Sequence, residues 1–132
     1  MKIDITVSCG ELLDKLSILE IKSKKIKDKD KLKNIAHEKL ILSSKAETLR
    51  NADPNKYQSF FDELLEINQK LWKIEDEIRI FEKDKIFNEN FIKLARQVYV
   101  TNDLRFDIKN KINIFYKSGI IEEKEYINYK TL

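Results

Sequence analysis

Apolar residues recur every three or four positions over most of this chain, which is the spacing of one face of an α-helix. The clearest run lies between residues 54 and 83 and keeps this spacing without a break. It consists of Tyr57, Phe60, Leu64, Ile67, Leu71, Ile74, Ile78 and Phe81. The run predicts a helix over 54–83 with a coiled-coil type of apolar seam, roughly 45 Å long at about 1.5 Å per residue.

The same spacing predicts three further helices, over residues 9–27, 31–51 and 89–117. Their expected boundaries come from local signals. Ser8 with Glu11 three residues later forms the pattern of a capping box. Asp53 and Pro54 end one helix and begin the next, and the Ser118-Gly119 pair is expected to supply the left-handed cap that ends the last helix.

The two ends of the chain show different patterns. Ile3, Ile5 and Val7 alternate with polar residues, which predicts an extended N-terminal segment over 1–8. This segment either lies over the helices or pairs with the same segment of a second chain. Residues 120–132 form a tail, in which 122–129 predicts a short amphipathic helix that presents Tyr126 and Tyr129.

Together these elements predict an all-α fold in one domain, residues 1–132. We expect an antiparallel helical bundle of two helical hairpins, in which the two helices of the first hairpin are short and those of the second are long. The long hairpin should extend past the short one. An extension of this kind exposes apolar seam unless a second chain covers it, so a homodimer is expected.

Composition supports this interpretation and excludes several functions. Charged residues make up 37% of the 132 positions, against about 25% in an average domain, with only two glycines and one proline. The chain lacks a glycine-rich phosphate-binding loop, and its single cysteine and single histidine provide neither a disulfide nor a multi-histidine metal site. We therefore expect no cofactor.

The distribution of charge gives further expectations about partners and location. Residues 22–33 contain seven lysines and two aspartates but no aromatic residue and no arginine, so a nucleic-acid partner is not expected. Apolar runs of membrane-spanning length are lacking, and Asp4 interrupts the stretch where a secretion signal would be apolar. The sequence thus predicts a soluble cytoplasmic protein without a membrane partner.

The candidate chemistry lies in the two long helices. Lysine outnumbers arginine 22 to 4, yet three of the four arginines fall in this pair of helices. Arginine binds carboxylate or phosphate through two parallel hydrogen bonds, which lysine cannot do. The candidate ligand-binding residues are Trp72, Asp76 and Arg79 on the helix over 54–83, and Arg96, Tyr99, Asn102, Asp103 and Arg105 on the helix over 89–117.

Two interpretations of these residues remain open. In the first they form a structural ion-pair network, with Arg79 bound to Glu75 or Asp76 and with Arg96 or Arg105 bound to Asp103. Asp76 is another possible partner of Arg105. In the second they form a pocket for a small phosphorylated or carboxylated ligand, in which Asp76 or Asp103 could act as an acid or base. The protein is thus expected to be a non-catalytic interaction module acting as a homo-oligomer, with an enzyme or binding protein for an anionic metabolite as the alternative.

A magnesium site is a third possibility that the spacing does not favour. The pairs Glu63 and Glu66, and Asp103 and Asp107, place carboxylates on helix faces, as all-helical magnesium-dependent pyrophosphohydrolases do. Those enzymes are expected to space their acidic motifs differently, and pairs of this kind arise by chance among 23 acidic residues. We therefore assign no metal site.

Four segments carry a resemblance to a known family: GELLDKLSILEIK (10–22), INQKLWKIEDEIRIFE (67–82), FIKLARQVYVTNDLRFDIKNKIN (91–113) and EEKEYINY (122–129). They resemble a family of small helical bacterial and phage proteins known only as a domain of unknown function. The resemblance covers nearly the whole chain and implies no activity. The family pattern that it implies includes Asp14, Lys15, Glu20, Trp72, Glu75, Asp76, Arg79, Arg96, Tyr99, Asn102, Asp103 and Arg105.

Overall fold

The fold consists of four helices joined by short turns. The computed structural model describes residues 1–130. Its helices are α1 (Cys9–Lys25), α2 (Lys29–Ala52), α3 (Pro54–Lys83) and α4 (Glu89–Phe115). No strand occurs within residues 1–130, so the all-α class expected from the sequence is confirmed for this part of the chain.

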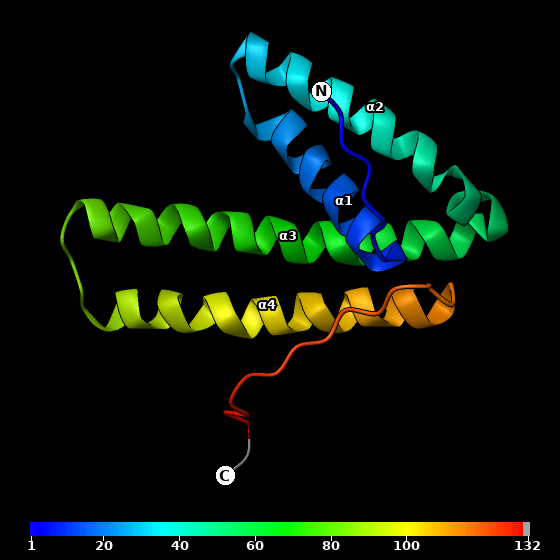
Figure 1. Cartoon of the computed structure of the whole chain (residues 1–132). Helices are drawn as coiled ribbons and strands as arrows, with labels where there is room; N and C mark the ends of the chain where they lie inside the picture. Colours follow the sequence, from blue (N-terminus) through cyan, green and yellow to red (C-terminus); the bar gives the residue numbers. More distant parts are fainter. Residues whose placement is uncertain (131–132) are drawn as a thin grey trace.

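The helices α3 and α4 lie side by side, and α1 and α2 cross them obliquely near one end (Figure 1). α1 and α3 each pack against all three other helices. α1 buries Leu12, Leu16 and Leu19 of its expected seam, and also a second stripe that includes Leu13, Ser17 and Ile21. The main core unites Leu12, Leu13 and Leu16 with residues from the other helices: Ala46, Tyr57, Phe60, Leu64 and Ile112.

The helix starts follow the expected capping chemistry. Ser8 Oγ accepts a hydrogen bond from the Glu11 amide, and Asp53 caps α3 with Pro54 as the first helical residue. The glutamate half of the predicted capping box is not formed at α1. The Glu11 carboxylate instead contacts Lys109 of α4, because that ammonium lies within hydrogen-bond distance.

The ends of α3 and α4 differ from expectation. In each, a lysine takes the left-handed position that glycine usually occupies, Lys85 with φ 56° and Lys117 with φ 51°. Hydrogen bonds from Ile86 to the Phe81 carbonyl and from Ser118 to the Asn113 carbonyl complete the two turns. The prediction that Ser118-Gly119 supplies the left-handed residue is wrong, because the turn closes two residues earlier than Gly119.

The one glycine required by packing is Gly10, in the first turn of α1. A Cβ atom at this position would lie 2.5 Å from the carbonyl oxygen of Lys109 and 3.0 Å from Asn113 Oδ1. The Gly10 amide donates a 2.7 Å hydrogen bond to the same Asn113 oxygen. The start of α1 therefore rests directly on the backbone of α4.

The far end of the α3–α4 pair is packed differently. Between residues 75 and 100 no residue is buried, whereas α3 buries Ile74 immediately before this stretch and α4 buries Thr101 immediately after it. We call residues 75–100 the arm. Figure 1 shows it extending past α1 and α2, which lie over the other half of the pair.

The predicted short helix over 122–129 is wrong. Residues 118–130, which we call the C-terminal segment, are non-helical and run along α4. Glu122 and Lys124 are half-buried while Glu123 and Glu125 are exposed, which is the alternation of an extended chain. The ion pairs that these two inward side chains make with α4 favour this conformation over a short helix, which is only marginally stable by itself. The last two residues of the predicted tail, 131–132, lie outside the described residues.

Candidate functional site

A buried aspartate joins three helices at the centre of the molecule. Asp14 of α1 is fully buried and accepts a two-pronged interaction from Arg105 of α4, through Nε at 2.9 Å and through Nη2. Asn68 of α3 donates 2.8 Å hydrogen bonds to Asp14 Oδ1 and to Ser17 Oγ, and Ser17 Oγ donates to the Asp14 carbonyl. The hydrogen bonds that Arg105 donates to Asp14 raise the pKa of Arg105 above its ordinary value.

The partner of Arg105 is therefore not the one expected from the sequence. Neither Asp76 nor Asp103 meets it; the carboxylate comes from Asp14, 91 positions away in the chain. A charge as deeply buried as that of Asp14 requires an opposite charge and satisfied hydrogen bonds. This pairing explains why α4 has an arginine, Arg105, where it packs against α1.

A second cluster ties the C-terminal segment to the start of α1. Lys109 donates to Glu11 at 2.6 Å and to Glu122 at 2.9 Å, and Ser8 donates a 2.6 Å hydrogen bond to the other Glu122 oxygen. Burial opposes the charged form of both ionised partners. The hydrogen bonds that Lys109 donates to the two glutamates outweigh burial and raise the pKa of Lys109, while the bonds that Glu122 accepts from Ser8 and Lys109 lower the pKa of Glu122.

A third cluster lies farther along the C-terminal segment. Asp103 of α4 pairs with Lys124 and accepts a 2.7 Å hydrogen bond from the Tyr129 hydroxyl. These two bonds lower the pKa of Asp103, and the bond to Asp103 raises the pKa of Tyr129 to about 12. The Lys124 ammonium also lies 5.4 Å from the ring centre of Phe106 and 5.3 Å from that of Tyr126.

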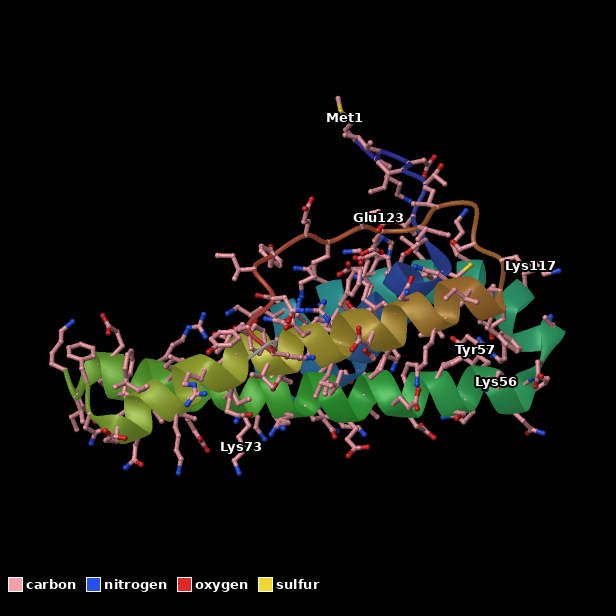
Figure 2. All side chains as sticks on the ribbon, turned by 90° about the horizontal axis from the view of Figure 1, so that it is seen from below. Met1, Lys56, Tyr57, Lys73, Lys117 and Glu123 are labelled. Atoms are coloured by element: carbon pink, nitrogen blue, oxygen red, sulfur yellow. The ribbon has the colours of Figure 1, made fainter. Side chains whose placement is uncertain are left out.

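Between α4 and the C-terminal segment lies an open groove with a volume of about 790 Å³. This is within the range of small-molecule pockets, about 300–1,000 Å³. The segment passes over α4 on the side away from α3, with Glu123 on its course, whereas Lys73 of α3 projects from the opposite side of the molecule (Figure 2). The groove is lined by Val98, Tyr99, Asn102, Asp103, Arg105, Phe106, Lys109, Glu122, Glu123, Lys124, Tyr126, Ile127 and Tyr129.

The structure brings half of the candidate residues to this groove. Tyr99, Asn102, Asp103 and Arg105 of α4 line it. The remaining four, Trp72, Asp76, Arg79 and Arg96, do not line it: Trp72 is half-buried and the other three are exposed. Arg79 pairs with Glu75 of its own helix, one of the two partners expected for it.

Three residues of the site are not among the candidates predicted from the sequence: Asp14 of α1, Lys109 of α4 and Glu122 of the C-terminal segment. Asp14 is preceded by Gly10 and followed by Ser17 at helical spacing, so a stripe of small and polar residues runs beside the leucines of α1. That stripe is a signal in the sequence for close, polar helix contact. Lys109 and Glu122 carry no comparable signal, because only the fold brings them together.

Membrane-spanning helices and metal-binding groups both bear on function. No helix within residues 1–130 is long and apolar enough to cross a membrane. In the same range, no three histidine, cysteine or acidic side chains gather as a group that could hold a metal ion.

Comparison with known proteins places the chain in a family without assigning an activity. No curated protein and no solved structure matches the chain. One family model matches residues 1–131, a span that includes α1 to α4 and the C-terminal segment. The chain therefore belongs to the family of unknown function DUF6165.

Proposed function

We propose that this protein is a non-catalytic interaction module that acts as a homodimer, with the arm as the contact between the two copies. The observation that carries the proposal is the lack of any buried residue between positions 75 and 100. Helical seams are normally covered by packing, and a soluble protein that leaves one open uses it for association.

Two helices by themselves cannot cover the seam of the arm. Its inward residues Ile78, Phe81 and Leu94 are only half-buried. Large apolar side chains are also exposed around it: Ile80 at 58%, Ile86 at 43%, Phe87 at 55% and Ile92 at 52%. A second arm would complete a four-helix arrangement, in which each seam faces the other three helices.

The charges of the arm favour pairing with an identical arm. Residues 75–83 of α3 carry four carboxylates and two cations, whereas residues 89–100 of α4 carry one carboxylate and two cations. In a twofold dimer, α3 of each copy can lie against α4 of the other. The more acidic helix then meets the more basic one, at both halves of the contact.

The expected size of the contact is small. Nine residues of α3 and twelve of α4 belong to the arm, which at about 1.5 Å per residue gives helix faces roughly 14 and 18 Å long. Stable interfaces commonly bury about 800 Å² per partner, and a face of this length is at the lower end of that class. We therefore expect a dimer that forms at micromolar rather than nanomolar concentration.

The ionisable groups of the groove support a role without catalysis. A general acid or base needs a pKa moved toward the working pH. In the groove the opposite holds: the pKa of Asp103 and that of Glu122 are lowered, and the pKa of Lys109 is raised, so each group is held in its charged form. This is the behaviour of groups that hold the fold together.

The alternative of an anionic metabolite bound by the arginine cluster finds less support. Arg105 already holds a carboxylate at Nε and Nη2, and Arg79 is paired with Glu75. An anion at Arg105 would compete with Asp14, which is fully buried and cannot be left unpaired.

The test compares two matched double variants by light scattering or analytical ultracentrifugation across the micromolar range. Ile80→Glu with Ile92→Glu adds two charges to the arm, while Leu40→Glu with Ile114→Glu adds two charges at exposed apolar positions elsewhere. The arm variant is expected to be a monomer of about 16 kDa, as set by the 15.8 kDa chain, and the control variant a dimer.

A monomeric wild type would contradict the proposal, as would equal dissociation by both variants. Truncation of residues 1–7 tests the remaining possibility, that the N-terminal residues form the contact between the two copies. If that truncation alone abolishes the dimer, the contact lies in the N-terminal residues and the arm is excluded.

A further inference from the structure

In the groove between α4 and the C-terminal segment, aromatic rings and a carboxylate surround the Lys124 ammonium. The Lys124 ammonium lies within 6 Å of two ring centres, those of Phe106 and Tyr126, and pairs with the Asp103 carboxylate. Aromatic faces and a carboxylate around an ammonium are the elements by which proteins bind organic cations. The chain itself supplies the cation that occupies this position.

The cations of the groove are already bound by carboxylates of the protein. Three cations, Arg105, Lys109 and Lys124, line the groove beside three carboxylates, Asp103, Glu122 and Glu123, so the charges of the lining balance. Each of the three cations pairs with a carboxylate of the protein, which an incoming anion would have to displace.

The rest of the lining fits an apolar or aromatic body attached to such a cation. Val98, Tyr99, Ile127 and Tyr129 line the groove beside the ring pair around Lys124. The rings of Tyr99 and Tyr129 are in edge contact with each other, with centres 5.1 Å apart. The volume of about 790 Å³ is present with Lys124 in place, so a ligand body has room beside it.

We propose that this groove binds a small organic cation, a primary or quaternary ammonium on an apolar body. Lys124 of the protein competes with the charged group of this ligand for Asp103. Binding exchanges the Lys124 ammonium at Asp103 for that of the ligand. Lys124 is on the non-helical segment, so it can be displaced without opening the contacts among α1, α3 and α4. The proposal does not rest on the dimer contact: of the arm, only Val98 and Tyr99 at its base line the groove, and Ile80 and Ile92, which the dimer test changes, do not.

The experiment is a titration of benzylammonium followed by the backbone amide signals of α4 in an NMR spectrum. Benzoate and benzyl alcohol serve as probes of similar shape with opposite and no charge. Four proteins are compared: wild type, Lys124→Met, Lys124→Arg, and Lys124→Met combined with Asp103→Asn. Methionine keeps the apolar stem of Lys124 without its charge, and arginine keeps a cation at the site.

Lys124→Met is expected to bind benzylammonium at least about tenfold more tightly than wild type, a difference that direct titration resolves. Lys124→Arg should bind as weakly as wild type, and removal of the Asp103 charge should return the Lys124→Met protein to weak binding. Benzoate should bind no variant more tightly than benzylammonium does. Equal benzylammonium affinity in wild type and Lys124→Met, or a preference for benzoate, would overturn the proposal.

A further measurement applies if Lys124→Met releases the C-terminal segment, which random-coil signals from residues 122–129 would reveal. Benzylammonium is then titrated into wild type, and the Cε signal of Lys124 is compared with that of Lys117, which is exposed. A shift confined to Lys124 is expected from displacement. Equal shifts at the two lysines would contradict it.

Discussion

The two ends of the α3–α4 pair have similar helical patterns in the sequence and opposite packing in the structure. At one end α1 lies against both helices, and Asp14, Asn68 and Arg105 are joined in a buried network. In the arm the same heptad spacing continues through Ile78 and Phe81, yet none of the arm residues is buried by residues 1–130. The comparison shows that heptad spacing identifies a face that needs a partner, without telling whether the partner belongs to the same chain.

The largest expected effect is a difference in stability between arginine variants at the two ends. Arg105→Met leaves the buried Asp14 carboxylate unpaired and should lower the free energy of unfolding by about 3–5 kcal/mol. Arg79→Met in the arm removes an exposed pair with Glu75 within one helix and should cost at most about 0.5 kcal/mol. Urea denaturation of both variants measures the difference, and similar losses for the two would contradict the contrast.

The second prediction uses the only two glycines of the chain. Gly10→Ala places a Cβ against the Lys109 carbonyl oxygen and should cost about 1–3 kcal/mol, the usual effect of overpacking. Gly119→Ala meets no atom within 4 Å and lacks a positive φ, so it should be neutral or stabilising by up to about 1 kcal/mol. Thermal unfolding provides the measurement; an unchanged midpoint for Gly10→Ala would exclude the close approach of α1 to α4.

The third prediction concerns the left-handed lysines at the ends of α3 and α4. Glycine removes the strain of a positive φ, so Lys117→Gly should stabilise the protein by about 0.5–1 kcal/mol. Lys85→Gly, at the tip of the arm, should have the same effect only if the arm unfolds together with the rest of the protein. A stabilisation by Lys117→Gly that Lys85→Gly does not match would show that the arm unfolds separately.

The smallest effect is expected from pH, and we expect it first in the C-terminal segment; the pKa of Glu20 in α1 is also lowered, by its hydrogen bond with Lys39 of α2. The folded-state pKa values of Asp103 and Glu122 are lowered, so their contribution to stability is present above their unfolded values, near 4. It is lost as pH falls through the lower folded values. Limited proteolysis between pH 5 and pH 2, with an acid-active protease, should show the segment cleaved first, while circular dichroism still reports the helices. Simultaneous loss of segment and helices would contradict this.

The parts of the fold that local chemistry determines could be predicted from the sequence. The spacing of Leu64, Leu71 and Ile74 places them in the core, and the caps at Ser8 and Asp53 begin the helices where expected. The C-terminal segment could not be predicted in the same way. The pattern of residues 122–129 suits a short helix, and what keeps it extended is contact with Lys109 and Asp103, which are distant in the sequence.

Only part of the candidate site could be predicted, for a similar reason. Helical spacing places Asn102, Asp103 and Arg105 on one helix, and all three line the groove. It cannot tell which neighbour each side chain meets. Trp72 and Asp76 were assigned to the same pocket because α3 and α4 are adjacent, but the groove lies on the side of α4 that faces away from α3.

We propose that the arm is stabilised by a second copy, whereas the end packed against α1 is stabilised within the chain. Amide hydrogen exchange at several protein concentrations tests this claim most directly. Protection of residues 75–100 should increase with concentration, while protection of α1 and of α3 before Ile74 stays constant. Protection of the arm that is independent of concentration, or a dependence that appears in α1 instead, would contradict the claim.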